Sequence, residues 1–330
     1  VDDSSTIIKV LQKIFSQDEK IEVVASTQDP REVEKLLDEH NPDVVTLDIN
    51  MPHRDGISVL KETFPKYKIP TILISSLSIQ ESEKVLEGLE HGAVDYVHKP
   101  TGQQNMADLA QEIIDKVHNA AKADTQNTER TDHHETSRHS LNTKSLVLIG
   151  ASTGGVTAIQ EILGHLPEKI PPIVITLHIP QNFSRAFADR LNKECPFNVK
   201  EAEDREDVRE NHVYVAPGGT QLKIDEVGGQ RVLRVTDDDP VNRFKPSVDY
   251  LFNSAVDHLA SPTIGIILTG MAKDGAKGIK KLKDAGVHTI AQDENTSVVF
   301  GMNKEAIRIG AIDHVVPLGE ISDKICELSE

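Results

Sequence analysis

Short apolar runs, each followed by a helical pattern, alternate twice along this chain of 330 residues. In the first part the runs fall at 21–25, 43–48, 71–75 and 93–97, with patterns such as Ile57-x-x-Leu60 between them. Strands that alternate with helices predict a parallel sheet covered by helices on both faces. Ligands of such sheets bind beyond the carboxyl ends of the strands, so the residues that follow each run are the candidate functional residues.

The second alternation covers residues 145–330 and predicts another α/β domain, doubly wound and mostly parallel. Strands are predicted at 146–149, 172–177, 212–216, 231–236, 264–268, 289–291 and 314–316, and helices at 156–163, 247–259, 274–285 and 303–309.

Between the two alternations, residues 119–144 hold almost no aliphatic side chain beyond alanine and Leu141. Such a segment buries too little apolar surface to order itself, so we predict a flexible linker between domains at 1–118 and 145–330. His133, His134 and His139 lie in it without a cysteine or a paired carboxylate, which favours a solvated linker over a metal site.

Composition excludes several classes of function. The formal net charge of -17 argues against nucleic-acid binding, which needs a basic face. The longest apolar runs have fewer than ten residues and are too short to cross a bilayer, so we expect no membrane insertion. Cys195 and Cys326 lie far apart and fit reduced thiols, so we expect a cytoplasmic protein and give neither cysteine a catalytic role.

Charged and hydroxyl residues follow the strands of the first domain. Asp48 ends the run 44–47, Ser75 ends 71–74, Lys99 follows Tyr96-Val97, and Asp2 and Asp3 follow Val1. Clustered carboxylates suit Mg²⁺, which prefers oxygen ligands. Asp48 is therefore a candidate phosphate acceptor.

These residues resemble the receiver domain of two-component response regulators. The resemblance covers residues 1 to about 118 and rests on Asp2-Asp3-Ser4, Asp48 with Met51-Pro52-x-x-Asp55-Gly56, Ser75, and Gly92-Ala93-x-Asp95-Tyr96-x-x-Lys99-Pro100. It implies a flavodoxin-like fold, phosphorylation of Asp48, Mg²⁺ held by Asp2, Asp3 and Asp48, and switch roles for Ser75 and Lys99. A receiver has an apolar strand before the acid pair, so we expect the natural chain to extend before Val1.

A serine stands on a glycine-rich turn at the start of the second domain. Ser152 follows the apolar run 146–149 and precedes a predicted helix, whose free N–H groups could stabilise an oxyanion. Gly150, Gly154 and Gly155 allow a tight turn. A phosphate-binding turn would use similar residues, and Gly150-x-Ser152-x-Gly154 also matches the nucleophile elbow of α/β-hydrolases, so the turn alone leaves these alternatives open.

A nucleophilic serine needs a base and an orienting acid. His178 ends the apolar run 173–177, and Asp274 follows the run that ends at Leu268. In isolation, His178 could be an ordinary strand-end histidine and Asp274 a helix N-cap. The chain order Ser, His, Asp differs from the Ser, Asp, His order of α/β-hydrolases, which predicts a serine triad on another fold.

The second domain resembles the catalytic domain of the chemotaxis protein-glutamate methylesterases, the CheB family. The matching stretches, which cover nearly all of 145–318, are 149–155, 178–180, 215–219, Pro246-Ser-Val-Asp249, Leu268-Thr-Gly-Met271 with Asp274-Gly-Ala276, 291–294 and 299–302. Two positions depart from the family pattern: Ala272, where glycine is usual and a positive φ would strain alanine, and Leu177, where glutamine is common.

The resemblance implies that Ser152 attacks the γ-methyl ester of a receptor glutamate, that His178 carries the proton and that Asp274 orients His178. Thr153 and Met271 match site-lining positions, and the Met271 N–H is a candidate oxyanion donor. The resemblance also implies glutamine deamidation and a catalytic domain without a metal. The implied partners are methyl-accepting chemotaxis receptors, whose clusters would recruit the protein, and the chemotaxis histidine kinase, which would phosphorylate Asp48.

The resemblance further implies that the unphosphorylated receiver covers the active site and that phosphorylation raises activity. Arg243 and Lys245 are candidate contacts for acidic receptor helices, although a solvated basic pair is favoured. Two other classes of function remain as alternatives. One is a docking module that has lost catalysis, which the complete Ser152, His178 and Asp274 set disfavours. The other is a DNA-binding regulator, which the net charge disfavours.

Overall fold

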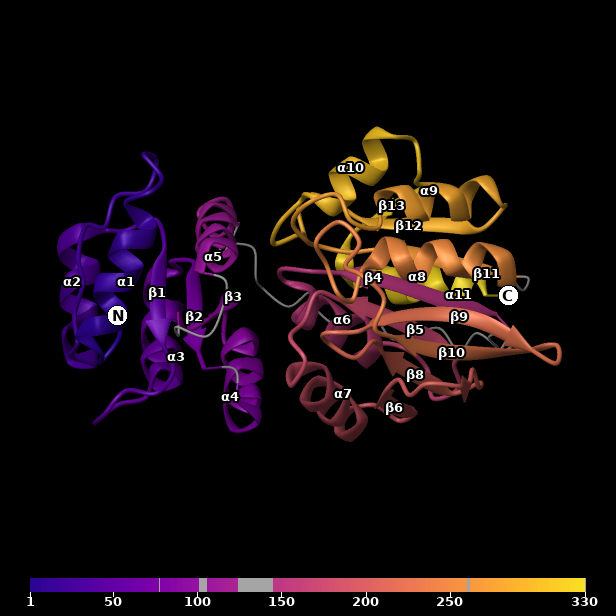
Figure 1. Cartoon of the computed structure of the whole chain (residues 1–330), viewed down its shortest axis with the longest axis horizontal. Coiled ribbons are helices and arrows are strands. Elements are labelled where there is room, and N and C mark those ends of the chain that lie inside the picture. The colour runs from indigo at the N-terminus through magenta and orange to yellow at the C-terminus, as the bar shows by residue number, and fades with distance from the viewer. Residues whose placement is uncertain (77, 101–105, 124–144, 260–261, 330) are drawn as a thin grey trace. The chain divides into compact units, whose positions relative to one another are not determined.

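The chain forms two compact units, Val1–Thr128 and Glu129–Glu330, in a computed structural model (Figure 1). The structure describes residues 1–76, 78–100, 106–123, 145–259 and 262–329. The predicted linker and its three histidines therefore lie almost entirely outside the described residues.

The first unit is built on a parallel sheet in the order β1-β2-β3, as the alternation predicts. Its strands are β1 (Val45–Asp48), β2 (Thr71–Ser75) and β3 (Ala93–His98), and its helices are α1 (Ser5–Phe15), η1 (Pro30–Glu32), α2 (Val33–His40), α3 (Gly56–Tyr67), α4 (Ile79–Glu90) and α5 (Met106–Ala120). Helix α1 contacts α5, whereas α3 contacts α2 and α4. The predicted boundary at residue 118 falls two residues before the end of α5.

The apolar run 21–25 does not form the strand that we predicted from it. Val1 is bonded to β1, since its ammonium donates to Thr46 O at 2.8 Å and its carbonyl accepts from Asp48 N at 3.0 Å. The next residue, Asp2, donates to Thr27 O, just beyond this segment. One or two residues cannot form the ladder that an edge strand needs. Val23 and Val24 accordingly stay 40% and 45% exposed.

The second unit contains a seven-stranded parallel sheet in the order β13-β12-β11-β4-β5-β8-β6. The strands are β4 (Leu146–Ala151), β5 (Ile173–Leu177), β6 (Asn198–Glu201), β8 (His212–Val215), β11 (Thr263–Ile267), β12 (His288–Gln292) and β13 (His314–Val316). Strand β4 lies in the middle of the sheet and all of its residues are buried, so it is part of the hydrophobic core.

Helices α6 (Gly155–Gly164), α7 (Phe183–Glu194), α8 (Val248–Ala255), η2 (Val256–His258), α9 (Ala276–Asp284), α10 (Met302–Arg308), η3 (Leu318–Glu320) and α11 (Ile321–Leu328) complete the fold (Figure 1). The predicted strand 231–236 exists as β10 (Gln230–Thr236), but it belongs to a separate antiparallel sheet with β7 (Glu206–Asp207) and β9 (Gln221–Val227). Among the described residues, no helix combines the length and the apolar character needed to span a membrane.

The sheet order fixes where the candidate site lies. Strands β11, β4 and β5 are neighbours and parallel, so their carboxyl ends meet at one edge of the sheet. Ser152 follows β4, His178 follows β5, and Asp274 lies in the turn after β11. Three residues far apart in the sequence are thereby brought to one edge.

Candidate active site and phosphorylation site

Ser152 is held on a tight turn between β4 and α6. Its N–H donates to Thr269 O at 3.0 Å, and its carbonyl accepts from Gly155 N at 2.7 Å. Gly154 has a φ of 77°, in the left-handed region that glycine tolerates. Gly270 packs so closely that a Cβ there would lie 2.7 Å from Ser152 Cβ. The serine is therefore fixed by backbone hydrogen bonds and by the close approach of Gly270.

His178 bridges the serine and the acid. Its Nδ1 lies 3.1 Å from Ser152 Oγ, and its Nε2 lies 2.8 Å from Asp274 Oδ2. For Ser152 to donate to Nδ1, the imidazole must carry its own hydrogen on Nε2, where that hydrogen is donated to Asp274. The two ring nitrogens thus serve the opposite partners from those in the chymotrypsin-type triad.

Asp274 is fully buried, and hydrogen-bond donors surround its carboxylate. Besides His178, Oδ2 accepts from Val248 N at 2.6 Å, and Oδ1 accepts from Asn242 Nδ2 at 2.7 Å and Ser247 Oγ at 2.8 Å. Burial alone would raise the pKa of this carboxyl, but the hydrogen bonds and the neighbouring imidazole outweigh burial and lower the pKa below its usual value. Asp274 is therefore a fixed negative charge behind the imidazole.

A turn at 241–244 supplies two contacts that the sequence analysis missed. Val241 and Phe244 pair through backbone bonds in both directions, and Asn242 and Arg243 between them have positive φ. The Phe244 ring stacks on His178 with centroids 3.6 Å apart and planes 5° from parallel. Asn242 Nδ2 donates to both Asp274 and Asp249. An asparagine just before the quoted Pro246-Ser-Val-Asp249 motif was the available signal, since asparagine tolerates positive φ.

A buried valine connects the two backbone segments that carry the serine and the acid. Val248, the first residue of α8, is fully buried, and its N–H donates to Asp274. A Cβ on Gly150 would lie 2.2 Å from Val248 Cγ1, and a Cβ on Gly275 would lie 2.6 Å from the same atom. The two glycines therefore leave the space that Val248 fills.

The predicted oxyanion residues lie beside the serine in the chain or in space. Thr153 is buried directly after Ser152, and its carbonyl accepts from Thr269 Oγ1 at 2.9 Å. Met271 directly follows Gly270, the residue packed against Ser152. Ala272 has a φ of 74°, so the strain expected of alanine in place of glycine is present.

The remaining candidates of the second unit have other environments. Arg243 is exposed, and Lys245 forms an ion pair with Asp237 at 2.5 Å. Cys195 and Cys326 are free thiols, and burial, with the nearby Glu194 carboxylate, raises the pKa of Cys195 to about 11, which keeps it protonated and unreactive.

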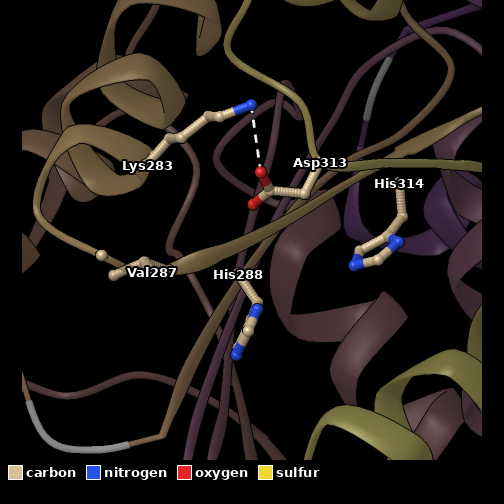
Figure 2. A pocket seen from close by; sticks show the side chains of 6 residues that line it. Lys283, Val287, His288, Asp313 and His314 are labelled. Carbon is tan, nitrogen blue, oxygen red and sulfur yellow. Dashed lines mark ion pairs between the residues drawn. The ribbon is translucent and has the colours of Figure 1, made fainter.

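A pocket lined in part by His288 and His314 lies at the amino ends of β12 and β13 (Figure 2). Ser152, in contrast, follows the carboxyl end of β4. A Lys283–Asp313 ion pair of 3.0 Å lies on one side, near His288 and His314. The residues around this pocket do not form the candidate metal site. Within the part of the chain that the structure describes, the side chains close enough together to hold a metal ion are those of Asp2, Asp3 and Asp48.

In the first unit, the structure brings the three predicted acids together. One carboxylate oxygen from each of Asp2, Asp3 and Asp48 lies within 4.8 Å of the others. Asp2 and Asp48 are buried, and Asp2 Oδ2 accepts no hydrogen bond. A buried carboxylate oxygen without a donor fits a site for a hard cation such as Mg²⁺.

Lys99 reaches the same cluster from the end of β3. Its Nζ lies 2.7 Å from Asp48 Oδ2 and 3.6 Å from Asp2 Oδ2. Burial, with the nearby Asp2 charge, raises the pKa of Asp48 from 3.8 to about 6, although the Lys99 ammonium acts in the opposite direction. The cluster carries more negative charge than Lys99 offsets.

The backbone beside Asp48 leaves no room for a side chain at Gly56. A Cβ on Gly56 would lie 2.0 Å from Asp48 O, and Gly56 N donates to Ile49 O at 2.8 Å. Asp55 caps α3 by accepting from Ser58 N. The Asp55-Gly56 pair therefore closes the loop that follows the acceptor.

Ser75 lies at the carboxyl end of β2, between the other two strands. Its carbonyl accepts from Lys99 N at 2.7 Å, and Ile49 N donates to Ile74 O. Its hydroxyl donates to Glu81 Oε2 at 2.5 Å. The structure thus places Ser75 at the same edge as Asp48 and Lys99, with its hydroxyl hydrogen directed to a residue that the sequence analysis did not single out.

Comparison with known proteins matches both units. Residues 147–325 match the CheB methylesterase model, and residues 1–111 match the response regulator receiver domain. The protein-glutamate methylesterase/protein-glutamine glutaminase 3 of Burkholderia lata is 40% identical over 98% of this chain and 93% of its own. The corresponding protein of Bordetella bronchiseptica is 42% identical over 98% and 95%. The crystallised CheB methylesterase catalytic domain of Thermotoga maritima is 41% identical with a TM-score of 0.54, over 56% of this chain and 97% of that domain.

Proposed function

Because this chain belongs to the CheB methylesterase family, we propose that it hydrolyses glutamate γ-methyl esters on chemotaxis receptors, and deamidates receptor glutamines, under the control of Asp48 phosphorylation. The observation that carries the proposal is the continuous hydrogen-bond relay from Ser152 through His178 to the buried carboxylate of Asp274. That geometry also disfavours the docking-module alternative, which has no need of an ordered relay.

The relay supports acyl transfer through the serine. Ser152 Oγ attacks the γ-carbonyl carbon while His178 Nδ1 takes the hydroxyl proton, and the Asp274 charge stabilises the imidazolium that forms. Collapse of the tetrahedral intermediate breaks the bond to the methoxy oxygen, which takes the proton from His178 and leaves as methanol. With a glutamine, the leaving group is ammonia.

Water completes the cycle. His178 takes a proton from the attacking water, the bond between Ser152 Oγ and the acyl carbon breaks, and the serine recovers its proton. The N–H groups of Thr153 and Met271 are the proposed donors to the oxyanion, which gains most from donors that are already fixed in place. The Thr269 contacts to Ser152 N–H and Thr153 O fix the backbone around the first of these two donors.

The receiver site is proposed to accept a phosphoryl group on Asp48, with Lys99 and Ser75 as its protein partners. Asp2, Asp3 and Asp48 would hold Mg²⁺, which supplies positive charge to offset the charge of the phosphoryl group. Lys99 adds a positive point charge 2.7 Å from Asp48 Oδ2. The proposed phosphodonor is the chemotaxis histidine kinase, and the proposed location is the cytoplasm, at receptor clusters.

Methanol release from methylated receptor membranes tests the proposal. We expect methanol release by the wild-type chain to increase when acetyl phosphate is added. Ser152→Ala should release no methanol with or without acetyl phosphate. Asp48→Asn should release the same amount in both conditions. Release that survives in Ser152→Ala would contradict the serine mechanism. Release by Asp48→Asn that still rises with phosphodonor would contradict control through that residue.

A further inference from the structure

The carboxylate of Glu81 collects hydrogen bonds from the residues around the phosphorylation site. Its Oε2 accepts from Ser75 Oγ at 2.5 Å and from Ser76 N at 2.6 Å, and its Oε1 accepts from Asn50 Nδ2 at 2.6 Å. Asn50 N in turn donates to Asp48 Oδ1 at 3.2 Å. Glu81 is therefore linked both to the proposed switch serine and to the loop of the phosphate acceptor.

Helix capping does not account for these contacts. Ser78 caps α4 by accepting from Glu81 N, so Ser78 and Glu81 have the spacing of a capping box. In a capping box the glutamate side chain returns to the N–H of the cap residue itself. Here the Glu81 carboxylate reaches past Ser78 to Ser76 and Ser75. Glu81 therefore accepts hydrogen bonds from the end of β2 through its carboxylate, while its N–H donates to the cap of α4.

A serine hydroxyl has a single hydrogen to donate. While that hydrogen is donated to Glu81, Ser75 cannot donate it to a phosphoryl oxygen on Asp48. Phosphoryl transfer from acetyl phosphate forms a bond between an Asp48 carboxylate oxygen and phosphorus and breaks the phosphorus–oxygen bond to acetate, which leaves with the electron pair. The product brings about two negative charges to the same edge of the sheet as the Glu81 carboxylate.

We propose that Glu81 is a positioning residue that competes with the phosphoryl group for the Ser75 hydroxyl, so that the phosphorylated state forms only as Ser75 leaves Glu81. This inference rests on the proposed phosphorylation of Asp48. Glu81 then sets how much phosphodonor the receiver needs.

The test measures phosphorylation of the full chain directly, by mass spectrometry, over a range of acetyl phosphate concentrations with Mg²⁺ present. Glu81→Gln replaces the charged acceptor with a weaker neutral one, so we expect half-maximal phosphorylation at about tenfold less acetyl phosphate. Glu83→Gln is the matched control, because Glu83 is exposed on the same helix and the charge change is the same. We expect Glu83→Gln to behave like the wild type.

A second pair of variants separates competition for the hydroxyl from simple charge repulsion. In a Ser75→Ala background there is no hydroxyl to compete for, so Glu81→Gln should have no more effect than Glu83→Gln. An equal gain in both backgrounds would overturn the inference in favour of charge alone. Glu81→Asp, which keeps the charge but is one methylene shorter, should also lower the phosphodonor requirement if the hydrogen bond is what matters.

The outcomes also separate this inference from the proposed function. A folded wild-type chain that takes up no phosphoryl group would overturn the phosphorylation itself and the inference with it. Normal uptake by the wild type, with the Glu81→Gln curve lying on that of Glu83→Gln, would overturn the inference alone.

Discussion

Asp48 and Asp274 occupy equivalent places in the two units, yet their environments differ. Each carboxylate is buried at the carboxyl-end edge of a parallel sheet. Asp274 accepts from side chains and backbone N–H groups on both oxygens, and its pKa is lowered. Asp48 accepts from Lys99 and Asn50 N but lies beside Asp2, and its pKa is raised to about 6.

The difference shows how the two sites are prepared for charge. The environment of Asp274 is complete before any substrate arrives, which is what electrostatic preorganisation requires. The cluster around Asp48 has an excess of negative charge that a cation would offset. The environment of Asp274 thus stays the same from one turnover to the next, whereas the electrostatic environment of Asp48 changes when a cation binds beside it.

Asp274→Asn changes the preorganised carboxylate behind His178 and should have the largest effect of the variants considered. An amide can donate to His178 Nε2 and so favour the tautomer with hydrogen on Nδ1, which cannot accept the Ser152 proton. We expect methanol release to fall by about 10³-fold or more. Asp257→Asn, at an exposed position, is the control and should be unaffected. Activity within tenfold of wild type would show that Asp274 does not orient His178.

Asn242→Ala removes one donor from the Asp274 carboxylate and should have the next largest effect. Loss of a charge-assisted hydrogen bond is worth about 1–3 kcal/mol, so we expect kcat to fall by about 10- to 100-fold. The missing donor favoured the charged carboxylate, so the pKa of Asp274 should also rise toward its ordinary value, which an NMR titration of the carboxyl carbon would measure. Asn295→Ala, an exposed asparagine, should change neither quantity.

Asp48→Asn tests the excess of negative charge around Asp48. The quantity measured is the free energy of unfolding of the receiver, with a chelator present to remove divalent cations. The folded pKa of about 6 exceeds the 3.8 of an ordinary aspartate, so the wild type loses stability as the pH rises through this interval. At pH 8 we expect the receiver of Asp48→Asn to be more stable by about 1–3 kcal/mol, measured by urea unfolding. This gain should vanish below about pH 4.

Two comparisons check that result. Asp43→Asn, at an exposed position, should leave stability unchanged at both pH values. Added Mg²⁺ should narrow the difference between Asp48→Asn and the wild type, because the ion binds better where the carboxylate is intact. A wild-type chain that is more stable than Asp48→Asn at pH 8 without a divalent cation would contradict the excess of negative charge.

Phe244→Leu should have the smallest effect, since it leaves every hydrogen bond of the relay in place. Stacked aromatic rings contribute about 0.5–1.5 kcal/mol beyond their buried area, so we expect kcat to fall by about 2- to 10-fold. Phe244→Tyr keeps the ring and should restore activity. If both variants match the wild type, the stack with His178 does not position the imidazole.

Much of this arrangement could be predicted from the sequence. The family inferred from the motifs is confirmed by the matched models, and the predicted parallel α/β fold is confirmed in both units. Ser152, His178 and Asp274 could be placed together because each follows an apolar run, and the ends of neighbouring parallel strands share an edge. Their catalytic roles stay predictions until the variants are measured.

Other features could not be predicted because they depend on tertiary contacts, which local sequence patterns do not specify. The run 21–25 has strand composition, but strand formation needs a neighbouring backbone that its own residues do not specify. Asn242 and Phe244 reach the site through a turn with positive φ, and nothing in their spacing reports which way that turn folds back. Ser78-x-x-Glu81 has only the spacing of a capping box, and the contact of Glu81 with Ser75 depends on how α4 meets β2.

Val248 has a consequence for how this protein can change. It works as a spacer of fixed thickness between the segment that carries the nucleophile and the segment that carries the acid. A side chain at Gly150 would need a smaller residue at 248, whereas Gly275, with a φ of 86°, would be strained by any side chain. Positions 150 and 248 are therefore expected to vary together, and the separation between the nucleophile and the acid depends on the pair.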